Sequence, residues 1–160
     1  MRDVDGYRQI LAALTTCGAF ERVLFGPVPS PPLTEASAPY AWVLPSEWEE
    51  QGETDPEVPV RRVGFRIVLG ARDPDPLRAF DLCDQLAQVV SNGLTGQILP
   101  GPTGDTENIP ALSRISRGVY SSDLAGPPRS DECRCVLVGE WVYLVDAPTA
   151  HDETFMLEGP

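Results

Sequence analysis

The first amphipathic pattern in the chain predicts a helix over residues 3–17. Its apolar residues recur three and four positions apart, so a helix places them on one face. Asp3 is positioned to cap the start, and Gly18 lies just past the end, where glycine commonly closes a helix. The apolar face consists of Val4, Tyr7, Ile10, Leu11 and Leu14.

A second helical pattern begins at the dipeptide Asp75-Pro76 and ends near Gly93. Proline is favoured at the first helical position because the N–H that it lacks would have no partner inside the helix. The apolar stripe of this helix is wide enough to lie across one face of a β-sheet. It consists of Ala79, Leu82, Cys83, Leu86, Val89, Val90 and Leu94.

Five further segments show the patterns of β-strands. The clearest alternation is in 60–70, where Val63, Phe65, Ile67 and Leu69 face inward and Arg62, Gly64, Arg66 and Val68 face outward. Segments rich in proline and glycine at 26–39 and 95–111 predict irregular loops. The five strand segments are 19–26, 40–44, 60–70, 114–122 and 133–145.

The order of these elements predicts an α+β fold. Helices and strands that are apolar on one side bury that side by packing against each other. We expect a mainly antiparallel β-sheet of about four to five strands, with the two amphipathic helices packed on one face. We also expect a single domain over residues 1–146, followed by an acidic C-terminal tail over residues 147–160.

The segment between the second and third strands is strongly acidic. Residues 45–59 contain six acids and no base, and like-charge repulsion together with the flanking prolines predicts an extended, solvated loop. Trp48 lies inside this segment, either as an anchor for a partner or folded back onto its own sheet. The six acids are Glu47, Glu49, Glu50, Glu53, Asp55 and Glu57.

Composition narrows the function. The 160 residues carry a formal net charge of -12, which disfavours tight binding of nucleic acid phosphates. All twelve basic residues are arginine, so the chain has neither the lysine of a Walker A phosphate loop nor a Schiff-base lysine. No apolar run approaches the roughly 18 residues that a membrane-spanning helix requires.

The sequence gives only weak signals for catalytic or metal-binding residues. No serine stands in a nucleophile-elbow motif, and the single histidine, His151, lies in the expected tail. Asp81 and Asp84 fall opposite the apolar stripe of their helix, on the face that solvent should wet, so we expect them to be solvated surface charges and not catalytic groups. The cysteines Cys17, Cys83, Cys133 and Cys135 lack metal-site spacing and are expected to be small buried side chains in a reducing compartment. The sequence therefore predicts no catalytic residue, no metal site and no cofactor.

The succession of elements resembles that of the tail terminator, or tail-completion, proteins of long-tailed bacteriophages and related gene transfer particles. The resemblance covers about residues 4–146. It rests on an N-terminal helix that ends before RVLFG, followed by PYAWVL, VRRVGFRIVLGAR, DPDPLRAFDLCDQLAQVV and CRCVLVGEWVYLV.

The resemblance implies a non-enzymatic structural protein of the virion. Such a protein forms a homo-oligomeric ring, typically a hexamer, at the junction of tail and neck, after assembly in the cytoplasm of the bacterial host. The ring caps the tail tube protein and offers a docking surface to the head-completion or connector protein. Genomic DNA passes through the lumen without tight binding.

Two sets of residues are candidates for these contacts. Head-to-tail contacts close into a ring when the two contacting patches are complementary, and we expect Arg61, Arg62, Arg66 and Trp48 at the subunit interface. The acids at 45–59 are expected in the channel, where they repel phosphate, or at the interface. Three alternatives remain: another neck or connector subunit, a small ligand-binding regulatory α+β module with a pocket around Tyr40, Trp42 and Phe65, and a small enzyme that uses two carboxylates in a cleft.

Overall fold

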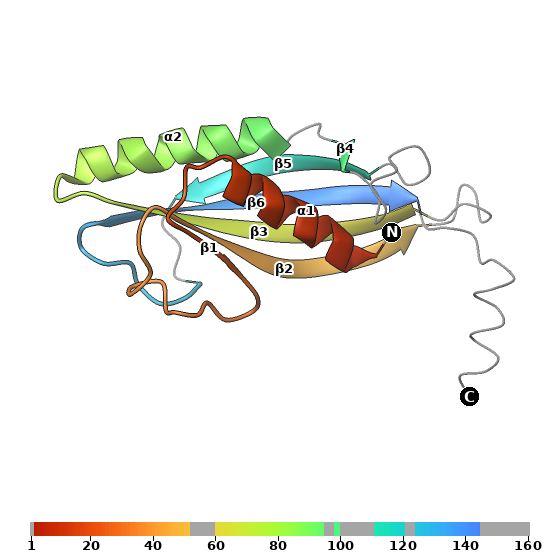
Figure 1. Ribbon diagram of the computed structural model, residues 1–160, viewed down its shortest axis with the longest axis horizontal. Coiled ribbons are helices and arrows are strands. Elements are labelled where there is room, and N and C mark those ends of the chain that lie inside the picture. The colour runs from red at the N-terminus through yellow and green to blue at the C-terminus, as the bar shows by residue number, and fades with distance from the viewer. Residues whose placement is uncertain (1, 52–59, 95–97, 100–110, 121–123, 145–160) are drawn as a thin grey trace, which may run out of the picture.

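The computed structural model describes residues 2–51, 60–94, 98–99, 111–120 and 124–144 (Figure 1). Within them lie two helices and six strands. In chain order these are α1 (Asp3–Thr16), β1 (Arg22–Phe25), β2 (Tyr40–Gln51), β3 (Val60–Arg72), α2 (Pro76–Leu94), β4 (Ile98–Leu99), β5 (Ala111–Tyr120) and β6 (Glu132–Leu144).

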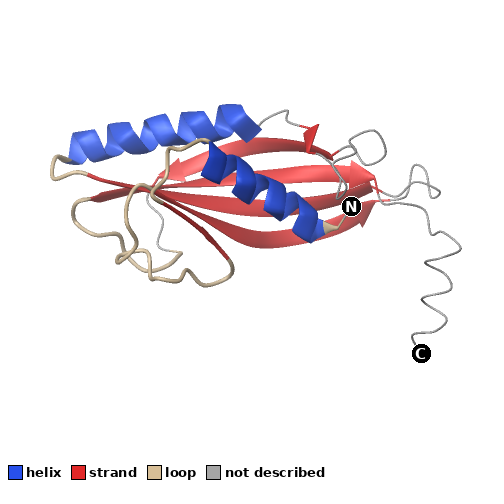
Figure 2. Cartoon of the chain, viewed as in Figure 1, coloured by secondary structure: helices blue, strands red, loops and turns tan. Residues whose placement is uncertain are grey.

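The strands form one sheet in the order β1-β2-β3-β6-β5-β4. Only the β1–β2 pair is parallel, and every other neighbouring pair is antiparallel. Both helices pack on the same face of the sheet (Figure 2). The predicted α+β fold is therefore confirmed, and the two-residue β4 brings the number of strands to six.

The N-cap residue of helix α1 lies one position earlier than the sequence suggested. Arg2 is the N-cap residue, and its backbone N–H donates to the Asp5 carboxylate at 2.8 Å. The expectation that Asp3 caps this helix is wrong, because its carboxylate is bound by Arg61 of β3. At the other end, Gly18 has the expected positive φ of 72°, which few other residues adopt without strain.

Helix α2 starts as predicted. The Asp75 carboxylate accepts a hydrogen bond from the Leu77 N–H at 3.0 Å, and Pro76 is the first helical residue. Gly93 lies inside the last turn rather than beyond it. The buried face is narrower than the predicted stripe, because Leu82 and Val89 remain 39% and 49% exposed.

The main core lies between the two helices and the sheet. The inward residues predicted for β3 are all buried in it, as are Trp141 and Tyr143 of β6. Cys83 and Cys135 are buried there too, and burial raises the pKa of the Cys135 thiol to about 11. Cys17, in contrast, is exposed, so the expectation of burial is wrong for this cysteine.

A second core covers part of the opposite face of the sheet. Because β1 and β2 are parallel, the chain between them must cross over the sheet, and residues 26–39 do so on the face away from the helices. Leu33 and Ala36 of this crossover cover Tyr40 and Trp42, and the Trp42 Nε1–H donates to the Gly26 carbonyl at 2.8 Å. The crossover is therefore packed, although it contains no helix or strand.

A buried polar network fastens the crossover to the sheet. Arg72 donates to the carbonyls of Ala36 and Leu33 at 2.5 and 2.7 Å, and it pairs with Glu132 at 2.9 Å. Glu132, whose side chain is fully buried, also pairs with Arg134. Arg134 is 1% exposed and donates a further hydrogen bond to the Gly126 carbonyl. Buried charges of this kind are tolerated when each has a partner of opposite sign.

Candidate functional site

The crossover leaves one half of the helix-free face uncovered, and this half is charged. We call it the open charged surface; its side chains are half-buried or exposed. They line two adjoining hollows, of about 130 Å³ and 290 Å³, that share Arg62 and Glu140. The charged members are Glu47, Glu49, Arg62, Arg66, Arg114, Arg117 and Glu140.

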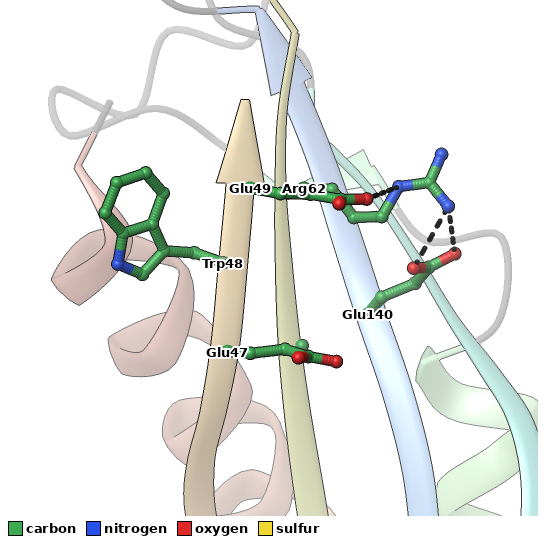
Figure 3. A pocket seen from close by; sticks show the side chains of 6 residues that line it. Glu47, Trp48, Glu49, Arg62 and Glu140 are labelled. Atoms are coloured by element: carbon green, nitrogen blue, oxygen red, sulfur yellow. Dashed lines mark hydrogen bonds and ion pairs between the residues drawn. The ribbon is translucent and has the colours of Figure 1, made fainter. Parts of the chain in front are cut away.

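Strand register places these charges in rows across the sheet. Gly64 of β3 pairs with Glu140 of β6, which pairs in turn with Arg114 of β5. The carboxylate of Glu140 receives Arg114 at 2.8 Å and Arg62 at 3.4 Å. Arg62 also approaches Glu49 at 3.8 Å (Figure 3). Part of the charge is thus satisfied within the chain.

Three members of the surface have no such partner. Arg66 and Arg117 lie in the next row, on either side of Val138. Neither arginine side chain makes a hydrogen bond or ion pair with another residue in the described part of the chain, and the same holds for the Glu47 side chain. Glu47 projects over Gly64, whose missing side chain leaves room for it (Figure 3). Uncommitted charges of both signs are therefore exposed on one surface.

Arg61 and Trp48 lie on the other face of the sheet, beside α1. Figure 3 shows Trp48 pointing away from Glu47 and Glu49, toward the helix. The Arg61 guanidinium lies 3.8 Å from the centre of the Trp48 ring and also pairs with Asp3 and Glu50. Trp48 remains 59% exposed, so it is stacked by one arginine without being buried.

The predicted interface set is thereby divided between two faces. Arg62 and Arg66 belong to the open charged surface, whereas Arg61 and Trp48 lie beside α1. Arg61 and Arg62 already have carboxylate partners in their own chain, and their pairing with a second subunit stays a prediction. No pattern in the sequence singled out Arg114, Arg117 and Glu140. Simple alternation places Arg114 and Arg117 on opposite faces of β5, and the register shift between Ile115 and Arg117 brings them to the same face.

The acidic segment is not a loop over its whole length. The expectation is wrong for residues 45–51, because β2 continues through Glu47, Glu49 and Glu50 to Gln51. Glu49 and Glu50 pair in register with Arg62 and Arg61 of β3, so arginines opposite offset the like charges. The remaining acids, Glu53, Asp55 and Glu57, and the expected tail 147–160 with His151 lie outside the described residues.

Other predicted chemistry is also placed by the structure. Asp81 and Asp84 accept hydrogen bonds from Gln85 and Gln88 one turn along α2. Asp81 is exposed as expected, but Asp84 is half-buried and also accepts from the Tyr120 hydroxyl of β5 at 2.9 Å, so the expectation of a solvated position is wrong for Asp84. Across the described ranges, no group of three or more His, Cys, Asp or Glu residues is arranged to hold a metal ion. No helix among the described residues is long and apolar enough to cross a membrane.

The pocket expected around Tyr40, Trp42 and Phe65 is not formed. All three side chains are buried, with exposures of 0%, 2% and 0%. Phe65 belongs to the core under the helices, while Tyr40 and Trp42 belong to the core under the crossover. The sheet therefore separates residues that the ligand-binding alternative places together.

Comparison with known proteins does not assign a family or a function to this surface. No protein-family model matches the chain, and no curated protein matches it.

Proposed function

We propose that the protein is a structural subunit of a long-tailed phage or related gene transfer particle, of the tail terminator type. In this role it forms a homo-oligomeric ring that caps the tail tube and offers a docking surface to the head-completion protein. The observation that carries the proposal is the open charged surface, where the exposed Glu47 and Arg117 and the half-buried Arg66 have no ion pair with another described residue, on a scaffold held by two cores.

The shape and lining of this surface support contact with a protein more than capture of a small molecule. Small-molecule sites are concave and mostly apolar, with volumes of about 300–1,000 Å³. The larger hollow here measures about 290 Å³ and is lined by four arginines and two glutamates. Charged, shallow surfaces of this kind give specificity and orientation to protein contacts.

The acidity of the chain supports passage of DNA without retention. A net charge of -12 repels phosphate, and Glu47 and Glu49 add carboxylates to one edge of the sheet. In the proposed ring these acids line the lumen or flank it. Glu49→Gln then increases retention of DNA by the assembled ring, which a filter-binding measurement at low salt detects.

The direct test is the size of the assembly. Native mass measurement and light scattering are carried out on the purified protein alone and with a polymerising tail tube subunit from the same particle. A closed ring, or a halt in tube growth when the protein is added, supports the proposal. A protein that stays monomeric in both conditions and leaves tube growth unchanged contradicts it. Preferential binding to the connector subunit instead assigns the protein to the neck.

A further inference from the structure

We propose that the β2 edge of one copy docks against the β5 edge of the next, with Glu47 of one copy facing Arg114 and Arg117 of the other. The inference rests on the proposed function, because it names the contact by which copies form a ring. The partner at each edge is a second copy of this chain. The argument for this partner is charge complementarity between the two edges of the sheet.

Both edges are available over part of their length. β1 covers β2 only from Tyr40 to Val43, and β4 covers β5 only at Ala111 and Leu112. Among the described residues, no strand lies on the outer side of β2 from 44 to 51 or of β5 from 113 to 120. These two free segments lie at opposite sides of the same sheet (Figure 1).

The free segments carry opposite charge. The β2 segment holds Glu47, Glu49 and Glu50 and no base, whereas the β5 segment holds Arg114 and Arg117 and no acid. Joining two β2 edges or two β5 edges brings like charges together, which costs free energy. A head-to-tail contact between a β2 edge and a β5 edge joins opposite charges, and repetition of such a contact closes into a ring when the rotation allows.

Strand direction fits the same arrangement. Each neighbouring pair in the series β2, β3, β6 and β5 is antiparallel, so β2 and β5 of one copy also run in opposite directions. A second copy related by rotation about an axis parallel to the strands therefore presents its β2 antiparallel to the β5 of the first. The alternation of strand direction continues across the contact.

The charges also lie at matching heights along the strands. Glu47 packs over Gly64, which is level with Arg114 through Glu140, and Arg117 lies one row further along. Rotation about an axis parallel to the strands keeps every residue at its own height. Glu47 of one copy then faces Arg114 of the next, with Arg117 about 7 Å along the strand at 3.3–3.4 Å per residue.

Side chains make this contact, and the hydrogen-bonded sheet does not continue through it. Pro45 lies in the free segment of β2 and has no N–H to donate, and a bulge interrupts the register between Pro45 and Trp48. Both features protect an edge strand from unspecific pairing. Recognition between copies thus depends on the charged side chains.

A charge-swap experiment tests the contact. Glu47→Arg and Arg117→Glu are made separately, together in one chain, and as a mixture of the two single variants. Neither residue has an ion pair with another described residue, so the fold is unaffected. Each single variant weakens self-association about tenfold or more, and both the doubly substituted chain and the mixture recover part of it, because Arg114, which position 47 also faces, is the same in every variant. Glu35→Arg and Arg22→Glu make the same charge changes away from the free segments and leave association unchanged.

Sedimentation velocity measures the association, and fluorescence provides an independent readout. Trp48 on β2 is 59% exposed, while Trp42 and Trp141 are 2% and 0% exposed, so a shift in emission on assembly reports the β2 edge. If the wild type associates and the single variants associate equally well, the proposed contact is wrong, whereas the proposal that the protein forms a ring still stands. If the mixture associates no better than its components, the head-to-tail pairing is wrong. A wild type that stays monomeric at every concentration overturns the contact, and the tube-subunit mixture then decides the proposed function separately.

Discussion

Arg61 of β3 forms a two-point ion pair with Asp3 of α1, with Nε 2.8 Å from Oδ1 and Nη2 2.6 Å from Oδ2. The Tyr143 hydroxyl donates to the same Oδ1 at 2.8 Å, and the third arginine nitrogen binds Glu50 at 2.9 Å. The pair fixes the first turn of α1 on the sheet. Because the Arg61 side chain is only 17% exposed, solvent screens this pair less than a surface ion pair.

Asp3→Asn removes the charge and keeps the shape of the side chain. We expect the free energy of unfolding to fall by about 1–3 kcal/mol, since a half-buried guanidinium loses its carboxylate partner. Urea unfolding measures the change. Glu35→Gln is the matched control, because Glu35 is exposed and makes no ion pair with any described residue; it should change stability by less than about 0.5 kcal/mol. Equal stability of Asp3→Asn and wild type contradicts the anchoring role.

The same pair makes stability depend on pH in a defined direction. The hydrogen bond from Arg61 is the main cause that lowers the pKa of Asp3 in the folded protein. The unfolded state then binds more protons in acid, so the stabilisation is present above the ordinary aspartate pKa of about 3.9 and is lost as pH falls toward the lowered folded value. The stability difference between wild type and Asp3→Asn is therefore constant near neutral pH and shrinks below about pH 4. A difference that grows in acid has the wrong sign.

Glu132 and Glu140 offer a comparison within one strand. Each lies on β6 and pairs with two arginines, but the Glu132 side chain is fully buried and the Glu140 side chain is 18% exposed beside open solvent. Glu132→Gln leaves buried arginines uncompensated and should cost about 3–5 kcal/mol, whereas Glu140→Gln should cost about 1 kcal/mol or less. Hydrogen exchange on residues 33–36 distinguishes the two, because only the first change frees the crossover.

Two helical glycines should respond to alanine with opposite signs. Alanine normally stabilises a helix by up to about 1 kcal/mol relative to glycine. At Gly93 a new Cβ meets no atom within 4 Å, so Gly93→Ala should raise the midpoint of thermal unfolding. At Gly6 a Cβ lies 2.5 Å from the Trp141 ring, so Gly6→Ala should push α1 from the sheet and lower that midpoint. Stabilisation by both changes contradicts the close packing of α1 on Trp141.

Local pattern was enough to predict both helices, the inward face of β3 and the α+β class. The alternation in 60–70 gave the correct faces because one side of β3 is buried from Val63 to Ala71. The end of β2 was predicted wrongly because Glu49 and Glu50 are held in the sheet by Arg62 and Arg61, which follow later in the chain. Cross-strand pairing of this kind overrides local composition, and composition alone predicts a loop.

The contacts of the surface arginines were harder to predict from the sequence than the fold. Arg61 and Arg62 are adjacent in the sequence and lie on opposite faces, so a cluster of arginines in the sequence became two separate sets of contacts. The partners of both arginines come from distant segments, including α1 and β6. Which arginines remain uncommitted depends on those tertiary partners, and on the open charged surface the side chains of Arg66 and Arg117 have none among the described residues.

The crossover at 26–39 has a consequence for how such a protein can change over time. It divides one sheet face into a sealed half, where Glu132 and Arg134 hold fixed partners, and an uncovered half, where charges can be exchanged without touching a core. If the proposed docking role holds, substitutions on the uncovered half alter what the molecule recognises and leave its folding nearly untouched. A lineage can therefore acquire new neighbours while its architecture stays constant.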